Sequence, residues 1–159
     1  MKPRILAGIL AITVTMTGAL LATSGSAHAK GMAMRPKSVA MAPDDLKWEA
    51  MPGVDGVQVA MLWGNMKKGA YGCFVKMSPD QVHPLHTHTA PLKVVIVSGE
   101  FKYAPMGQEE KSYGPGSYLM VPGGSKHTSA SGSTELLMFQ ESTGAWDMKP
   151  ARAPAAAAK

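Results

Sequence analysis

Between residues 57 and 141 the chain alternates apolar and polar positions over short stretches, and turn residues interrupt the pattern repeatedly. The clearest stretch is residues 71–77, where one side of an extended chain would carry Tyr71, Cys73, Val75 and Met77. Because side chains alternate across a β-strand, a period of two predicts a strand with one buried face. Cys73 on that face is expected to be a buried core thiol.

The same pattern predicts further short strands, with Gly, Pro, Asn, Asp and Ser between them. No window has the length or the 3.6-residue period of a core helix. Many short strands at regular spacing favour an antiparallel barrel or a double-sheet jelly roll. The sequence therefore predicts an all-β single domain over residues 46–147, with strands at 57–63, 71–77, 86–89, 93–98, 101–105, 117–121 and 135–141.

The first 29 residues have the layout of a secretory signal peptide. Lys2 and Arg4 precede an apolar stretch, and Ala27-His28-Ala29 matches a small-residue cleavage site. The alternative is an uncleaved membrane anchor, since residues 5–22 are just long enough to span a bilayer. Glycine and threonine interruptions weaken that alternative. Cleavage predicts a periplasmic or secreted protein without stable membrane insertion.

Two further segments show no strand or helix period and are rich in small residues and proline, residues 30–45 and 148–159. A flexible linker and a disordered Ala/Pro tail are the predictions for them. Met32 and Met34 form a Met-x-Met pattern that suits a soft ion such as Cu(I). Because 13 methionines are spread along the whole chain, a linker is the better interpretation.

Composition excludes several classes of function. One cysteine in 159 residues excludes an intrachain disulfide framework and a cysteine-clustered zinc or iron–sulfur site. The formal charge is +5, and loss of Lys2 and Arg4 with the signal peptide lowers it to +3. The remaining lysines are scattered and form no basic stripe, so the sequence does not indicate nucleic-acid binding.

The histidines carry most of the candidate chemistry. His86 and His88 are two residues apart in a strand pattern, so their side chains leave the same face and can share one metal ion. His127 follows a Pro-Gly-Gly turn that could bring it back toward the barrel interior. His83 is out of phase with His86 and separated from it by Pro84, which predicts a surface residue.

These residues resemble the two sequence motifs of the cupin superfamily. Residues 116–127 match every fixed position of the second motif, which is Gly, five residues, Pro, one residue, Gly, two residues and His. The usual terminal Asn is replaced by Ser131. The first motif is Gly, five residues, His-x-His, three or four residues, Glu, six residues and Gly. Asp80 stands at its first Gly, while His86-Thr87-His88 and Gly99 match. The chain is thus similar to small single-domain exported cupins.

The resemblance implies a cupin jelly-roll barrel with His86, His88 and His127 as ligands of a divalent transition metal: Fe, Mn, Ni, Cu or Zn. Three imidazoles on one side of an ion leave positions for water, oxygen or a chelating substrate. The alternative is three hydrogen-bonded core histidines without metal. Other candidates to line the cavity are Tyr103, Tyr118 and Gln140.

Lys93 occupies the four-residue-spaced position of the family glutamate. An ammonium beside a divalent ion is repelled, which leaves three outcomes. Lys93 turns away as a solvated lysine, it stays in the cavity as a clamp for an anionic substrate, or it marks a site that has lost its metal. In the second of these outcomes Lys93 would have a catalytic role, as the clamp for the anionic substrate.

The function expected first is an exported, metal-dependent oxidoreductase of the dioxygenase kind, acting on a small organic substrate at the three-histidine site. A non-catalytic cupin that binds a metal or a small ligand is the alternative. A metal-free sugar-binding or isomerase-type cupin is the third. Cupins often dimerise through an edge strand, so the resemblance also implies a homodimer.

Overall fold

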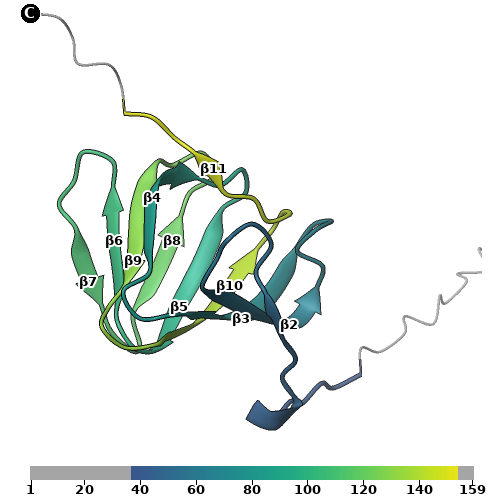
Figure 1. Cartoon of the computed structure of the whole chain (residues 1–159). Helices are drawn as coiled ribbons and strands as arrows, with labels where there is room; N and C mark the ends of the chain where they lie inside the picture. Colours follow the sequence, from purple (N-terminus) through teal and green to yellow (C-terminus); the bar gives the residue numbers. More distant parts are fainter. Residues whose placement is uncertain (1–36, 154–159) are drawn as a thin grey trace, which may run out of the picture. The chain divides into compact units, whose positions relative to one another are not determined.

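Segments with alternating burial pair into two antiparallel sheets within residues 37–153, the part of the chain that this computed structural model describes. The six-stranded sheet has the order β1 (Trp48–Ala50), β2 (Val57–Gly64), β3 (Tyr71–Met77), β10 (Leu136–Ser142), β5 (Leu92–Ser98) and β8 (Tyr118–Val121). The five-stranded sheet has the order β11 (Lys149–Pro150), β4 (Val82–Thr87), β9 (His127–Ser131), β6 (Phe101–Pro105) and β7 (Lys111–Tyr113). Figure 1 shows the two sheets facing one another. The predicted all-β jelly roll is confirmed.

The core lies between the sheets, and the period of two along the strands explains which side chains fill it. On β3 the alternate residues from Tyr71 to Met77 are at most 1% exposed. In the antiparallel register β10 sets Met138 opposite Val75 and Gln140 opposite Cys73, so its alternate residues face the same way. Burial of such apolar faces is the main force that holds two sheets together.

Four strands of the structure were not expected from the sequence: β1, β7, β9 and β11. Three of them are only two or three residues long, too short for a period to show. The fourth, β9, reads His-Thr-Ser-Ala-Ser and lacks the apolar alternation of a typical strand. Similarly, β4 begins at Val82, four residues before the predicted start at residue 86.

The C-terminal segment stays in the fold beyond Asp147, where the sequence places the start of a disordered tail. Lys149 and Pro150 form β11 and pair with Thr87 and His86 of β4. The Ala151 N–H also donates to the Leu85 carbonyl at 2.9 Å. The tail prediction therefore begins several residues too early, because partners far away in the sequence supply the hydrogen bonds. Pro150 is tolerated because β11 is an edge strand.

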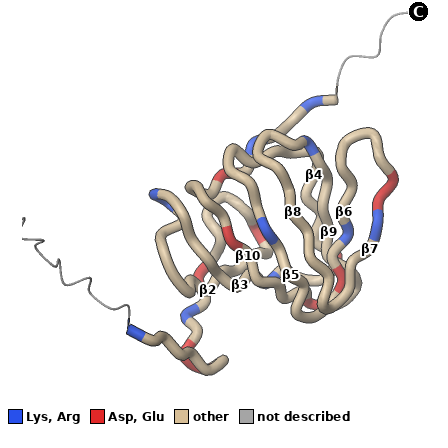
Figure 2. The backbone as a smooth tube through the Cα atoms, turned by 180° about the vertical axis from the view of Figure 1, so that it is seen from behind, with Lys and Arg blue, Asp and Glu red and all other residues tan. Residues whose placement is uncertain are grey.

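The segment before the barrel is exposed from residue 37 to residue 45 and includes a short 3-10 helix, η1 (Pro43–Asp45). The predicted signal peptide, Met32 and Met34 lie outside the described residues. Between residues 37 and 153, no helix has the length and apolar character that crossing a membrane requires. Figure 2 shows the positions of charged residues scattered along the described backbone, without a long run of one sign.

Candidate metal centre

The structure brings His86, His88 and His127 together at the core side of the five-stranded sheet. All three are buried, and one ring nitrogen of each lies within 4.8 Å of the others. His86 and His127 are direct register partners of β4 and β9. His88 follows two residues after His86, so its side chain returns to the same face.

A glycine turn just before His127 brings this residue close to His88. Gly124 has φ +77°, a left-handed conformation that favours glycine, and its N–H donates to the His88 carbonyl at 2.7 Å. A Cβ at Gly123 would lie 2.5 Å from the Thr89 carbonyl oxygen, so only glycine fits the close approach. The turn before His127 thus packs directly on the backbone that carries His88.

Each of the three imidazoles is oriented by a backbone carbonyl. The Nδ1 of His86 donates to Pro84 O at 2.7 Å, that of His127 to Ser125 O at 3.0 Å, and that of His88 to Asp147 O at 2.5 Å. A hydrogen bond at Nδ1 places the ring proton there and leaves Nε2 as the lone-pair donor. In all three rings Nε2 is therefore the nitrogen left free to bind a metal ion.

Burial keeps these rings in the uncharged form that binds metal. It lowers the pKa of His86 and of His88, although in each case a backbone carbonyl opposes the change. Burial, with a smaller effect of the neighbouring histidines, lowers the pKa of His127 to about 4, although the Ser125 carbonyl opposes the change. At neutral pH the site is a set of three neutral imidazoles, which suits Zn, Cu, Fe or Ni.

The cavity beside these rings has a volume of about 40 Å³. The five-stranded sheet contributes the histidines, Phe101 and Tyr103 to its wall. The six-stranded sheet contributes a mostly apolar wall from β2, β3, β5, β8 and β10, in which Gln140 is the polar side chain. Trp146 also lines it and packs against the His88 ring at a centroid distance of 4.8 Å. The described lining contains no carboxylate and no lysine.

Lys93 lies on the outer face of β5, away from the histidines. Its Nζ donates to Glu141 Oε1 at 2.8 Å, and its side chain is 51% exposed. This pairing raises the pKa of Lys93. The neighbouring Leu92 is buried and lines the cavity instead. Of the three outcomes that the sequence left open for Lys93, the structure has the one in which the lysine turns away, and it does not bring the predicted anion clamp to the site.

His83 corrects the sequence analysis, which placed it on the surface. It is 9% exposed and lines the same cavity as the three other histidines. The reason is a β-bulge: His86 lies three positions after His83 on β4, whereas their partners Ser129 and His127 on β9 are only two positions apart. The extra residue reverses the alternation, so His83 and His86 face the same way. Proline at residue 84 is a local signal for such a bulge.

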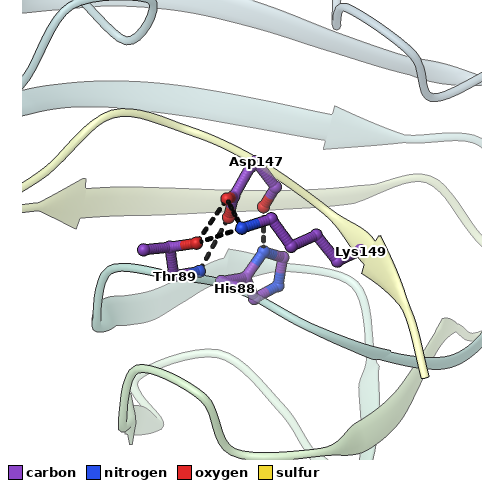
Figure 3. Close-up of polar contacts among 4 residues, drawn as sticks. All are labelled: His88, Thr89, Asp147 and Lys149. Atoms are coloured by element: carbon purple, nitrogen blue, oxygen red, sulfur yellow. Dashed lines mark hydrogen bonds and ion pairs between the residues drawn. The ribbon is translucent and has the colours of Figure 1, made fainter. Parts of the chain in front are cut away.

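The C-terminal segment covers the site and contributes a contact that the sequence did not reveal. Figure 3 shows Asp147 held between Thr89 and Lys149, with His88 beside its backbone. The Asp147 carboxylate accepts hydrogen bonds from Thr89 N at 2.7 Å and Thr89 Oγ1 at 2.5 Å, and it pairs with Lys149 at 3.0 Å. Burial is the largest single effect and raises the pKa of Asp147, but the contacts with Thr89 and Lys149 together outweigh it and lower that pKa to about 2. The carboxylate thereby anchors the carbonyl that orients His88.

The other candidate lining residues divide between the two faces. Tyr103 is buried and its ring lies 5.1 Å from that of His127. Gln140 is buried and donates through Nε2 to the Tyr71 hydroxyl at 2.7 Å. Tyr118 is 59% exposed and does not line the cavity. Cys73 is a buried core thiol, as predicted, and burial raises its pKa to about 12.

Solved structures with the same fold support the sheet arrangement. The polyketide cyclase RemF from Streptomyces resistomycificus has a TM-score of 0.58 at 17% identity, over 71% of this chain and 84% of that chain. An RmlC-like cupin from Shewanella frigidimarina has a TM-score of 0.56 at 18% identity, over 70% and 95%. The DMSP lyase DddQ from Ruegeria pomeroyi has a TM-score of 0.53 at 19% identity, over 64% and 57%. At these identities the likeness shows the fold alone.

The sequence itself matches a family. No curated protein shows a significant match to the chain. The family model described as the ChrR cupin-like domain matches residues 36–145, which include both cupin motifs and all four histidines of the cavity. The chain therefore belongs to the ChrR cupin-like domain family, in the cupin superfamily.

Proposed function

We propose that the barrel binds one divalent transition metal ion through His86, His88 and His127. The observation that carries the proposal is that three buried rings lie together and that each has Nδ1 bonded to a backbone carbonyl, which leaves Nε2 for an ion. Fe, Mn, Ni, Cu and Zn all accept imidazole nitrogen. A bound ion would supply a Lewis acid and, if redox-active, a one-electron centre.

The activity that we propose for this site is a metal-dependent, dioxygenase-like oxidation of a small organic substrate. Three histidines supply three neutral ligands and leave coordination positions for substrate and oxygen. The apolar wall of β3, β5 and β10 would exclude water from the reacting groups. Tyr103 and Gln140 are the other polar side chains that can orient a substrate there.

A non-catalytic function is the second candidate, and the size of the cavity favours it. A volume of about 40 Å³ holds a metal-bound ligand of only a few atoms. The lining also offers no carboxylate or lysine for general acid–base catalysis. A metal-free sugar-binding or isomerase-type cupin is the third candidate. It would give no role to the hydrogen-bond pattern that the three rings share.

Metal content is the first experiment. Protein purified from its native compartment should contain about one transition metal ion per chain, and His127→Ala should lose it while Lys93→Met keeps it. Metal analysis by mass spectrometry measures both. If the native protein contains no metal, and neither chelators nor added ions change its melting temperature, the metal-free function is the one that remains.

Oxygen consumption then separates the first two candidates. We expect the metal-loaded protein to take up oxygen with small enolisable or anionic compounds and His127→Ala to take up none. An oxygen electrode with a panel of short diketones and hydroxy acids provides the measurement. A metal-loaded protein without turnover for any loaded ion would favour the non-catalytic function.

We also propose that residues 1–29 direct export and are removed. The support is the charged start, the apolar stretch and the Ala27-His28-Ala29 site. Expression of the full chain in a bacterial host, followed by N-terminal sequencing of the periplasmic fraction, should find Lys30 as the first residue. Full-length protein retained in the membrane fraction would instead support the anchor.

A further inference from the structure

His83 is a buried imidazole that the three-ligand site does not use. It is 9% exposed, lines the cavity and lies 6.2 Å from His86 between ring centroids, in an edge-to-face arrangement. Its nitrogens do not join the group of ring atoms that lie within 4.8 Å of one another. His83 is therefore beside the candidate ion and not one of its three ligands.

The two ring nitrogens of His83 differ in their surroundings. Nδ1 lies 3.4 Å from the Ser129 hydroxyl, its register partner on β9. Nε2 is buried and has no hydrogen-bond partner among residues 37–153. Buried polar atoms in proteins are nearly always paired, and an unpaired one destabilises the fold. The missing partner of Nε2 is thus expected to be a molecule that enters the cavity.

Charge and size restrict what that molecule is. The three ligands are neutral, and no carboxylate lines the cavity, so a bound divalent ion would keep its full charge in a buried site. Burial of an uncompensated charge is costly, which favours an anion from solvent as the next ligand. About 40 Å³ of space, at ~10–15 Å³ for each water-sized group, limits the metal ion and its further ligand together to a few atoms.

We propose that His83 is a ligand-binding residue that donates a hydrogen bond from Nε2 to the outer atom of a compact anion held by the metal ion. The Ser129 hydroxyl lies 3.4 Å from Nδ1 and can donate to it, and in that arrangement the ring proton of His83 is on Nε2. The inference rests on the proposed metal site and adds its ligand class, a small monoanion of no more than about three non-hydrogen atoms. The bulge at Pro84 places the His83 ring in the cavity, because it turns this side chain to the same face of β4 as His86.

The test uses azide as the anion and Co(II) as a spectroscopic metal. Wild-type protein, His83→Leu and His83→Gln are loaded with Co(II), and azide is titrated while the visible spectrum of the ion is followed. We expect His83→Leu to bind Co(II) within threefold of the wild type and azide at least about tenfold more weakly, since a hydrogen bond to an anion is lost. His83→Gln retains an N–H donor and should recover most of the azide affinity.

Three results would overturn the proposal. Equal azide affinity in the wild type and His83→Leu would show that Nε2 does not touch the anion. A loss of Co(II) affinity of more than tenfold in His83→Leu would make His83 a metal ligand. If His83→Gln binds azide no more tightly than His83→Leu, the loss of azide affinity is due to packing and not to a lost hydrogen bond. His83→Met gives the same comparison as the leucine variant if that variant does not fold.

Failure of the metal site itself has a different signature. If the wild type binds no Co(II), the proposed function fails before azide is added. If the wild type binds Co(II) and His127→Ala does not, the metal site stands and the azide titrations alone decide the role of His83.

Discussion

Leu92 and Lys93 are neighbours on β5 whose side chains leave opposite faces of the sheet. Leu92 is 6% exposed and lines the cavity, while Lys93 pairs with Glu141 on the outside. The first cupin motif allows its glutamate at either of these two positions. In this chain the inward position carries an aliphatic side chain, so the cavity has no acidic ligand from β5.

A carboxylate at residue 92 should therefore act on the proposed metal site, and one at residue 93 should not. We predict that, without metal, Leu92→Glu lowers the free energy of unfolding by about 3 kcal/mol or more, because it buries an unpaired charge. Zn(II) or Co(II) should restore the stability of this variant. Its melting temperature should rise more on metal addition than that of the wild type. Scanning calorimetry with and without metal measures the difference.

Lys93→Glu is the matched control. It replaces an exposed ion pair with two like charges, which costs about 1 kcal/mol or less, and it should leave metal affinity within about twofold. A marked gain in metal affinity from Lys93→Glu, with none from Leu92→Glu, would contradict the outward orientation of Lys93.

The buried histidines make the stability of the metal-free protein depend on pH. Burial lowers the pKa of His83 and of His127 to about 4, from a usual value near 6.5. Between these values the unfolded chain binds protons that the folded chain does not, so the free energy of unfolding falls as pH drops from 6.5 to 4. Each ring contributes on the order of 3 kcal/mol over that window.

Urea unfolding in the presence of a chelator, at pH values from 8 to 4.5, tests this pH dependence. We expect constant stability above pH 7 and a steady loss below pH 6.5, with a shallower slope in His83→Leu. Constant stability from pH 7 to pH 5 would mean that the rings are protonated as easily in the folded chain as in the unfolded one.

Among the elements, β4 and the C-terminal segment shape the site most directly. The bulge in β4 turns His83 inward, and β11 closes the open edge of the same strand. Asp147 links the two, because its carboxylate is held by Thr89 while its carbonyl accepts from His88. An anchored carbonyl of this kind fixes both the tautomer and the direction of a ligand ring.

Loss of this anchor should weaken metal binding without removing a ligand. We predict that Asp147→Ala lowers metal affinity by about tenfold, at the lower end of the effect of outer-shell partners. Competition with a chromophoric chelator provides the measurement. Lys149→Met is the control, because its amine is an exposed partner of the same carboxylate and its loss should change affinity by less than about twofold. If both variants lose metal affinity to the same extent, the ion pair with Lys149 is what anchors Asp147.

At the scale of the whole molecule, the two sheets make different contributions to one cavity. The five-stranded sheet supplies the histidines, and the six-stranded sheet supplies most of the apolar wall. A polar wall facing an apolar wall is typical of small-molecule sites, in which a few polar groups orient a ligand within a mostly apolar cavity.

The homodimer implied by the cupin resemblance remains a prediction, and β8 is the edge strand that we expect to form it. This strand ends the six-stranded sheet and carries Tyr118 and Met120, which are 59% and 54% exposed. Sedimentation velocity should show a dimer that Met120→Lys disrupts. Met106→Lys, at a 42% exposed methionine after β6, should leave it intact. Sedimentation of the wild type as a monomer at all concentrations would contradict the prediction.

The sequence by itself determined the strand class of the fold and the three candidate ligands. Alternation along residues 71–77 is a local property of an extended chain, so it predicts the buried face of β3 directly. His86 and His88 share a face for the same reason. His127 was found through the match of residues 116–127 to a known motif, since no local pattern marks β9 as a strand.

Only the tertiary structure decided the surroundings of those ligands. The bulge that buries His83 depends on how β4 pairs with β9, and the choice between Leu92 and Lys93 depends on the register of β5. Asp147 and β11 reach the site through contacts with residues about sixty positions earlier in the chain. Periodicity reports the face of a single strand, whereas bulges, registers and closing segments are set by partners distant in sequence.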